Sequence, residues 1–253
     1  MSMKEPLVSV IIPVYTGSRL LKRAVDSALQ QDVPLEVIVV NDASPEDVDA
    51  VMAAYRENPC VVYLKNAQNC GAANSRNNGV AKARGRYVAF LDADDCWKAG
   101  KLKKQIDVLT KSDAVLCATA RELMYPDGRK TGRVIPVPEV ITYRDLLKHN
   151  CISCSSVVMK KEAAREFPMH HAQDSHEDYI MWLEILRKYG VARGVNEPLL
   201  QYTVSTSGKS GSKLHSAKMT LRVYKYMGFG PVKSALCFGS YALHGVWKHY
   251  IHK

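Results

Sequence analysis

Three aspartates, Asp92, Asp94 and Asp95, stand within four residues, directly after the apolar run 87–91. Carboxylates this close repel one another, so each binds a proton more readily unless a cation lies among them. Mg²⁺ and Mn²⁺ prefer oxygen ligands, and proteins commonly supply one or two carboxylates while substrate phosphates complete the shell. The cluster therefore predicts a site for a divalent cation and a phosphorylated ligand. The alternative is a solvated acidic turn in which Asp94 or Asp95 caps a helix starting at Trp97.

The elements around this cluster alternate between apolar β-branched runs and amphipathic helical patterns over the first 110 residues. Such alternation is typical of βαβ units and predicts an α/β fold with a parallel sheet. Ligands in open α/β sheets bind at the carboxyl ends of the strands, which is where the aspartates fall. We expect strands at 7–14, 35–42, 60–66 and 85–95, and helices capped by Ser18, at 44–58 and at 71–84.

Three further segments with polar or aromatic side chains follow strands in the same half of the chain. A tyrosine ring can stack on a base, a carboxylate accepts hydrogen bonds from ring N–H or hydroxyl groups, and arginine offers a planar fork of donors. Each residue also has a structural interpretation, as strand-end packing, a turn residue or a surface ion pair. The segments are Pro13-Val14-Tyr15, Asn41-Asp42-Ala43-Ser44 and Asn74-Ser75-Arg76-Asn77.

Together with "FLDADD" (90–95) and "HEDYIMWLEILRKYG" (176–190), these segments resemble the nucleotide-sugar glycosyltransferases of family 2, which have the GT-A fold. The resemblance runs from residue 7 to about residue 225. It implies a Rossmann-like, mostly parallel central sheet flanked by helices, with a C-terminal helical extension. It also implies a GT-A domain over 1–205, with a nucleotide-binding half (1–110) and an acceptor-binding half (111–205), followed by a mobile basic loop and amphipathic helices over 206–253.

The resemblance assigns a role to each of the polar segments. The segment that matches Pro13, Val14 and Tyr15 borders the nucleobase in this family. The aspartate that matches Asp42 bonds the base or ribose, and the arginine that matches Arg76 lies against the nucleotide.

The stretch Asp92-Ala93-Asp94 matches the DxD motif of the family. Its first carboxylate meets ribose or metal, and its second coordinates the divalent ion between the two phosphates. Asp94 and Asp92 are therefore the expected ligands of Mn²⁺ or Mg²⁺, and Asp95 is left as a candidate helix cap.

Sugar transfer with inversion needs a base that takes the proton of the attacking hydroxyl, and a carboxylate suits that task. The pair Glu177-Asp178 matches the acidic pair of the family, so Asp178 is the expected base and Glu177 is expected to orient the acceptor. An ordinary acidic first turn of a helix is the competing interpretation. Lys209 and Lys213 lie in a Ser-, Gly- and Lys-rich loop that could close over phosphates, or are solvated linker lysines.

The positive charge is concentrated in the C-terminal tail. The net charge is +10, no Asp or Glu follows Glu197, and eight Lys and Arg residues lie in the last 56. Such a tail could face nucleic acid, an anionic membrane or a phosphorylated substrate. The uncharged run 234–247 is 14 residues, shorter than the roughly 18–20 that span a bilayer. We expect no nucleic-acid partner, and either docking on an anionic membrane or packing of this helix on its own domain.

The start of the chain lacks the pattern of a secretory signal, and the seven cysteines are scattered and odd in number, which favours reduced thiols. Cys151 and Cys154 have a suggestive spacing, but no second pair or histidine spacing accompanies it, so buried structural thiols are expected. We therefore expect a cytoplasmic protein, peripheral at the inner face of the membrane if the tail docks there.

Processive relatives carry a QxxRW motif and membrane helices, and this chain has neither. The resemblance therefore implies metal-dependent, inverting transfer of a single sugar, from UDP-hexose or UDP-N-acetylhexosamine to a saccharide that can be lipid-linked. The pathways implied are bacterial O-antigen (lipopolysaccharide), capsule or exopolysaccharide assembly. The alternatives are a nucleotidyltransferase, which would want a Gly-rich basic loop after the first strand, a nucleic-acid-binding module, and a phosphoacceptor domain, which would want an acidic pair there.

Overall fold

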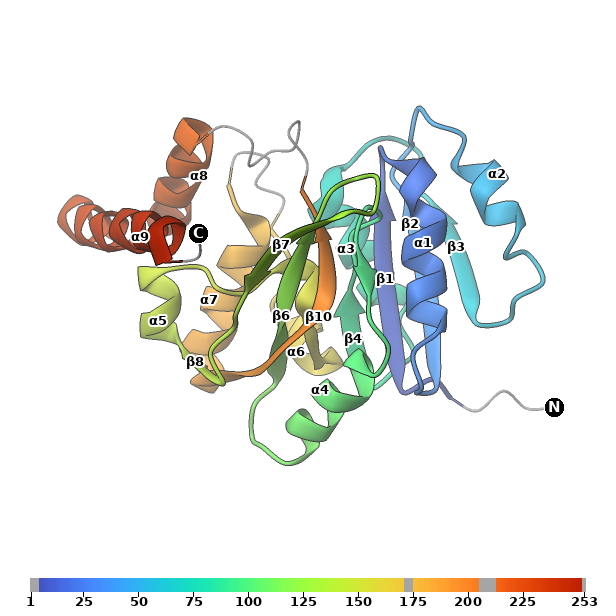
Figure 1. Cartoon of the computed structure of the whole chain (residues 1–253), viewed down its shortest axis with the longest axis horizontal. Coiled ribbons are helices and arrows are strands. Elements are labelled where there is room, and N and C mark those ends of the chain that lie inside the picture. Colours follow the sequence, from blue (N-terminus) through green and yellow to red (C-terminus); the bar gives the residue numbers. More distant parts are fainter. Residues whose placement is uncertain (1–4, 171–174, 205–212, 252–253) are drawn as a thin grey trace.

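Figure 1 shows the computed structural model, which describes residues 5–170, 175–204 and 213–251. Its strands are β1 (Val8–Val14), β2 (Leu35–Asn41), β3 (Val61–Lys65), β4 (Tyr87–Phe90), β5 (Cys96–Trp97), β6 (Leu116–Met124), β7 (Lys130–Ile135), β8 (Val140–Thr142), β9 (Val158–Lys160) and β10 (Val191–Thr203). Its helices are α1 (Ser18–Leu29), α2 (Val48–Ala53), α3 (Gly71–Lys82), α4 (Lys101–Thr110), α5 (Tyr143–Lys148), α6 (Lys161–Glu166), α7 (Glu177–Tyr189), α8 (Lys213–Tyr226) and α9 (Pro231–Ile251), with a 3-10 turn at Cys154–Ser156.

Within the described residues the strands form one sheet in the order β3-β2-β1-β4-β9-β6-β10-β5, with β7 paired to β6 and β8 paired to β10. The first four strands in this order are parallel: Val10 of β1 lies opposite Val37 of β2 and Ala89 of β4. β9 then pairs antiparallel with both β4 and β6, while β10 runs parallel to β6. The predicted GT-A-like α/β fold with C-terminal helices is confirmed, and every antiparallel pair within the described residues includes one of the strands β7 to β10.

Helices cover both faces of the sheet, because the parallel strands are apolar on both sides. Val10 and Ile12 of β1 belong to a buried cluster that includes residues of α1 and α4. Ile11, which points to the opposite face, belongs to a second cluster that includes residues of α3, α6 and α7, among them Trp182. Figure 1 shows α1 and α4 in front of the sheet and α3, α6 and α7 behind it.

Helix α3 lies close against β1 because residue 79 is a glycine. A Cβ atom at Gly79 would lie 2.5 Å from Cγ2 of Ile11, which is closer than real Cβ contacts come. The absence of a side chain at this position therefore allows the close approach of α3 to the sheet.

The first two helices begin at residues other than those the sequence predicts. Helix α2 starts at Val48 with Asp47 as its cap, instead of starting after Ser44. The reason is that the Glu46 carboxylate accepts the backbone N–H groups of Gly17 and Ser18, and so serves the start of α1. The cap of α1 is accordingly Gly17, and the prediction of a Ser18 cap was wrong.

The helix expected from Trp97 is also absent. Residues Cys96–Trp97 form β5, which pairs antiparallel with β10, and α4 begins only after its cap Gly100. Asp95 therefore caps no helix here, and its carboxylate instead binds the backbone of β10, as described below.

The C-terminal helices lie at the end of the molecule remote from β1–β3 (Figure 1). Helix α9 packs through Cys237, Phe238 and Tyr241 against the cluster that includes α5 and α7 residues. Within the described part of the chain, no helix is both long and apolar enough to cross a membrane.

Candidate active site

The carboxyl ends of β1, β2 and β4 bring the predicted nucleotide-binding segments to one edge of the sheet. Val14 is buried at the end of β1, whereas Tyr15, one residue further, has 43% of its surface exposed. Pro13 is partly buried in the strand itself. The exposed ring of Tyr15 is thus free of the core at the site where base stacking was predicted, while Val14 serves packing.

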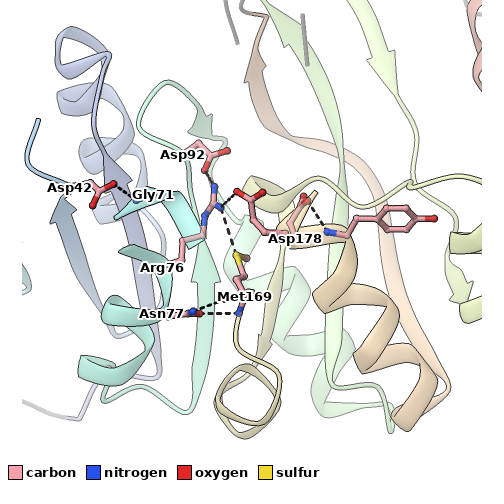
Figure 2. Close-up of polar contacts among 9 residues, drawn as sticks. Asp42, Gly71, Arg76, Asn77, Asp92, Met169 and Asp178 are labelled. Carbon is pink, nitrogen blue, oxygen red and sulfur yellow. Dashed lines mark hydrogen bonds and ion pairs between the residues drawn. The ribbon is translucent and has the colours of Figure 1, made fainter. Parts of the chain in front are cut away.

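Asp42 follows β2 and is buried at the start of α3. Its carboxylate accepts the backbone N–H of Cys70 at 3.0 Å and that of Gly71 at 2.8 Å, and the side-chain amide of Asn66 at 2.8 Å (Figure 2 shows the Gly71 bond). Burial acts to raise the pKa of Asp42, but these hydrogen bonds outweigh it and lower the pKa. Asp42 is therefore a fixed anion that holds the start of α3 against β2.

The residue after Asp42 has an unusual backbone. Ala43 adopts φ 53°, in the left-handed region that non-glycine residues seldom occupy. Ser44 follows, and its hydroxyl donates to the carbonyl of Tyr15 while its N–H binds the Asn41 side chain. The strained turn thereby joins the ends of β1 and β2, and such strain is often found at functional sites.

The acidic cluster lies beyond the end of β4. The backbone N–H of Asp92 donates to the hydroxyl of Ser155 at 3.1 Å, and Ala93 is buried. Burial, together with the neighbouring charge of Asp92, raises the pKa of Asp94 to about 6. The two carboxylates of the DxD motif are thus close enough to repel, as the sequence predicted, and their oxygens suit a hard cation.

Asp95 is fully buried and binds the end of β10. Its Oδ1 accepts the backbone N–H of Thr203 at 2.8 Å, while its Oδ2 has no hydrogen-bond partner within the described residues. Burial and the charges of Asp92 and Asp94 raise the pKa of Asp95 well above its usual range.

The end of β10 also binds the backbone of Asp94. Its carbonyl accepts from the hydroxyl of Thr203 and from the guanidinium of Arg23, which lies on α1, at 2.8 Å. Arg23 also donates to the Thr203 hydroxyl at 3.0 Å. Sequence reasoning missed Arg23 and Thr203, because nothing in their local sequence indicates a contact with the motif.

Arg76 lies at the centre of the site, on α3, with only 8% of its side chain exposed. One terminal nitrogen is 2.5 Å from the Asp92 carboxylate, and the other is 3.9 Å from that of Glu177. Its Nε is buried and has no hydrogen-bond partner within the described chain. Figure 2 shows the Arg76 guanidinium beside the Asp92 carboxylate. Arg76 was predicted as a nucleotide contact, and the structure shows that it joins the two acidic motifs.

Met169 and Asn77 hold the segment that precedes α7. The Asn77 amide donates to the Met169 carbonyl at 2.7 Å and accepts its N–H at 3.0 Å, as Figure 2 shows. Arg76 contacts the Met169 sulfur at 3.7 Å. Asn77 was part of a predicted segment, but its partner, about ninety residues away, was not predictable from local sequence.

The predicted acidic pair starts α7, after the cap His176. Asp178 accepts the backbone N–H of Tyr179 at 2.8 Å. Burial and the charge of Glu177 raise the pKa of Asp178, against the opposing effects of His176 and Arg76. A carboxylate whose pKa is raised takes up a proton more readily.

The predicted phosphate-binding lysines cannot be placed. Lys209 lies outside the described residues. Lys213 is the first residue of α8, but its side chain is not described. Helix α8 does approach the site, since the hydroxyl of Ser216 lies 3.5 Å from Nε2 of His176.

The residues present fit a divalent cation held together with a substrate. Asp92 and Asp94 offer carboxylate oxygens, and burial with the charge of Asp92 raises the pKa of Asp94. A cation close to both carboxylates would favour their charged forms. Within the described residues, no group of three or more His, Cys, Asp or Glu side chains is arranged to hold a metal. Phosphate oxygens would complete such a shell, which is common for Mg²⁺.

A mixed sheet with four parallel strands at one side, and an arginine between the Asp92 carboxylate and the acidic pair of α7, fit a glycosyltransferase. The family model "Glycosyl transferase family 2" matches residues 9–167. The chain therefore belongs to glycosyl transferase family 2 and is a glycosyltransferase, which confirms the resemblance. The match also decides against the nucleotidyltransferase and phosphoacceptor alternatives.

Two relatives are similar over nearly their whole length. TuaG of Bacillus subtilis (strain 168), whose name assigns it to teichuronic acid biosynthesis as a glycosyltransferase, is 36% identical over 249 residues, covering 96% of this chain and 98% of its own. The UDP-Glc:alpha-D-GlcNAc-diphosphoundecaprenol beta-1,3-glucosyltransferase WfaP of Escherichia coli is 31% identical over 244 residues, covering 96% of this chain and 95% of its own.

Two solved structures share the fold. TarS 1-349 of S. aureus in complex with UDP-GlcNAc aligns with a TM-score of 0.69 at 16% identity, covering 91% of this chain and 69% of that one. The mannosyltransferase PcManGT from Pyrobaculum calidifontis, in complex with GDP-Man and Mn2+, aligns with a TM-score of 0.69 at 18% identity. The alignment covers 94% of this chain and 69% of that one. Both support the GT-A fold.

Proposed function

We propose that this protein transfers a single hexose or N-acetylhexosamine from a UDP-sugar, with inversion, to a saccharide acceptor carried on a lipid diphosphate. The pathway proposed is the assembly of a bacterial surface polysaccharide. The names of the two full-length relatives support the pathway and the lipid-linked acceptor. The UDP-GlcNAc complex of a structure with the same fold supports the donor.

The observation that carries this proposal is the position of Arg76 between Asp92 and Glu177. It joins the motif expected to face the donor phosphates to the acidic pair expected to face the acceptor. Donor and acceptor would meet at this guanidinium, which, being always charged, attracts phosphate oxygens.

The residues can be assigned to the steps of the reaction. The acceptor hydroxyl attacks the anomeric carbon as the bond from that carbon to the diphosphate breaks, and Asp178 takes the hydroxyl proton. UDP leaves with the bonding electron pair, and Arg76 stabilises its negative charge. A divalent ion held by Asp92 and Asp94 would supply further stabilisation of the diphosphate. Tyr15 and Asp42 would border the base and ribose.

The experiment compares thermal stability with UDP, GDP, CDP and dTDP, each with and without Mn²⁺. We expect UDP with Mn²⁺ to raise the melting temperature most, because a ligand at 100 times its Kd stabilises by about 2.7 kcal/mol. Transfer is then followed with UDP-glucose and UDP-GlcNAc on a GlcNAc-diphosphate-lipid acceptor. Stabilisation by GDP alone would reassign the donor, and a lack of response to every diphosphate would contradict the proposal.

A further inference from the structure

Helix α9 has two faces of different character. Cys237, Phe238 and Tyr241 face the protein, and the Tyr241 ring stacks on His149 with ring centroids 5.9 Å apart. Val232, Leu236 and Leu243 face away from it and have 73%, 72% and 72% of their surface exposed. The two interpretations left open by the sequence, packing on the domain and an outward apolar face, thus apply to opposite sides of one helix.

The exposed apolar residues form a continuous row. At 100° per residue, Val232, Leu236 and Leu243 lie within roughly 40° of one another around the helix. The other exposed positions between Val232 and Leu243 are Lys233, Ala235, Gly239 and Ala242. Lys233 lies about 100° around the helix from Val232, and no charged residue occurs over 234–243. Single exposed apolar side chains are ordinary, but a contiguous row of them indicates an interaction surface.

A row of cations lies on the neighbouring helix. Lys218, Arg222 and Lys225 are exposed on α8 at positions i, i+4 and i+7, so they share one side of that helix. The sequence after Glu197 contains no Asp or Glu, so this part of the chain carries a net positive charge. Figure 1 shows α8 and α9 together at one end of the molecule.

We propose that the exposed row of α9 docks on an anionic phospholipid surface and that the cations of α8 strengthen this docking. An amphipathic helix that buries its apolar side at the lipid interface gains affinity from buried area and from attraction to anionic headgroups. A second copy of the chain fits this surface less well, because it would bring two positive surfaces together. The proposal rests on the proposed function in one respect, since a lipid-linked acceptor is presented at such a surface.

The test is flotation of the full chain with vesicles of phosphatidylcholine alone or of equal parts phosphatidylcholine and phosphatidylglycerol. The variant Val232→Ser/Leu236→Ser/Leu243→Ser should bind the anionic vesicles at least tenfold more weakly, because three apolar side chains no longer enter the interface. Lys218→Gln/Arg222→Gln/Lys225→Gln should lose roughly tenfold, and its residual binding should depend less on salt.

A matched control replaces exposed apolar residues elsewhere. Tyr125, Val134 and Val140 have 45%, 41% and 43% of their surface exposed, and the triple serine variant there should bind like the parent. Melting temperatures and stabilisation by UDP with Mn²⁺ show whether each variant is folded.

Binding to anionic vesicles that the α9 variant leaves unchanged would overturn the proposal. A second result would also overturn it: light scattering shows that the parent is a dimer and the α9 variant a monomer, and neither binds vesicles. The exposed row of α9 would then contact a second copy of the chain. Transfer to a water-soluble acceptor with a short alkyl chain separates the two proposals. Equal transfer by parent and α9 variant is expected, whereas no transfer by either counts against the proposed function while the vesicle result still decides the docking.

Discussion

Arg76 on α3 and Asp92 beyond β4 form a partly buried ion pair, with a terminal guanidinium nitrogen 2.5 Å from the carboxylate. The other terminal nitrogen of the same guanidinium is oriented toward Glu177. A planar fork can contact both carboxylates at once, whereas the single ammonium group of lysine cannot.

Arg76→Lys should therefore lower kcat/KM by roughly ten- to hundredfold, because one of the two contacts is lost. Arg76→Ala should in addition lower the free energy of unfolding by about 3 kcal/mol, since Asp92 is left partly buried without its partner. Steady-state kinetics and urea denaturation measure the two effects. Arg84→Lys, at an arginine paired with Glu36 at the opposite edge of the sheet, is the control and should leave kcat/KM unchanged.

Asp178→Asn should lower kcat by roughly 10²- to 10⁴-fold, because the amide cannot take the proton of the acceptor hydroxyl. Stabilisation by UDP with Mn²⁺ should stay as in the parent. Glu184→Gln, a carboxylate on the same helix that pairs with His170, should keep its turnover. Normal turnover by Asp178→Asn would assign the base to another residue.

Thr203→Val removes a hydroxyl that joins the Asp94 carbonyl and Arg23 but keeps the backbone N–H bound by Asp95. Loss of these hydrogen bonds should cost about 1 kcal/mol, which lowers the melting temperature by roughly 2–4 °C. Because the Asp94 backbone is then held less firmly, more Mn²⁺ should be needed for half-maximal stabilisation by UDP. Thr131→Val, which breaks a hydroxyl bond to the Leu123 carbonyl, should change stability but not this Mn²⁺ requirement.

Lys101 is fully buried, with its ammonium 4.0 Å from the centroid of the Trp97 ring. Burial lowers the pKa of Lys101 to about 7. Above that pH the unfolded chain holds a proton that the folded chain has released, so the free energy of unfolding should rise with pH. Cys117, whose pKa burial raises to about 11, opposes this rise only above its own unfolded pKa of about 8.5.

The rise between pH 7 and pH 8.5 should be roughly 1–2 kcal/mol. Lys101→Met should be more stable than the parent at pH 7 and should lack the rise, whereas Lys103→Met, at an exposed lysine of the same helix, should retain it. Chemical denaturation at several pH values measures this, and parallel curves for the parent and Lys101→Met would refute the assignment.

Local sequence predicted the elements whose signals are local. The apolar β-branched runs gave β1, β2 and β3 within one or two residues of their bounds. The predictions that were wrong concern residues whose hydrogen-bond partners lie far away in the sequence. Glu46 serves the start of α1 instead of starting α2, and Asp95 binds Thr203, more than a hundred residues away, instead of capping a helix.

The same distinction holds for the site. The types and order of Asp42, Arg76, Asp92 and Asp178 identified the family and the edge of the sheet. The partners that hold them were not predictable, because Arg23, Ser155 and Met169 are distant in sequence and their contacts with the site leave no periodic or spacing signal. The roles of the predicted site residues stay predictions for the experiments above.

The glycine at position 79 has a consequence for the position of Arg76 on the same helix. It lies one helical turn beyond Arg76, so the gap between α3 and Ile11 determines how far the guanidinium extends toward the acids. A single added methyl group at Gly79 would act as a spacer that pushes the helix outward. The absence of a Cβ atom at Gly79 thus helps to determine where the Arg76 guanidinium lies.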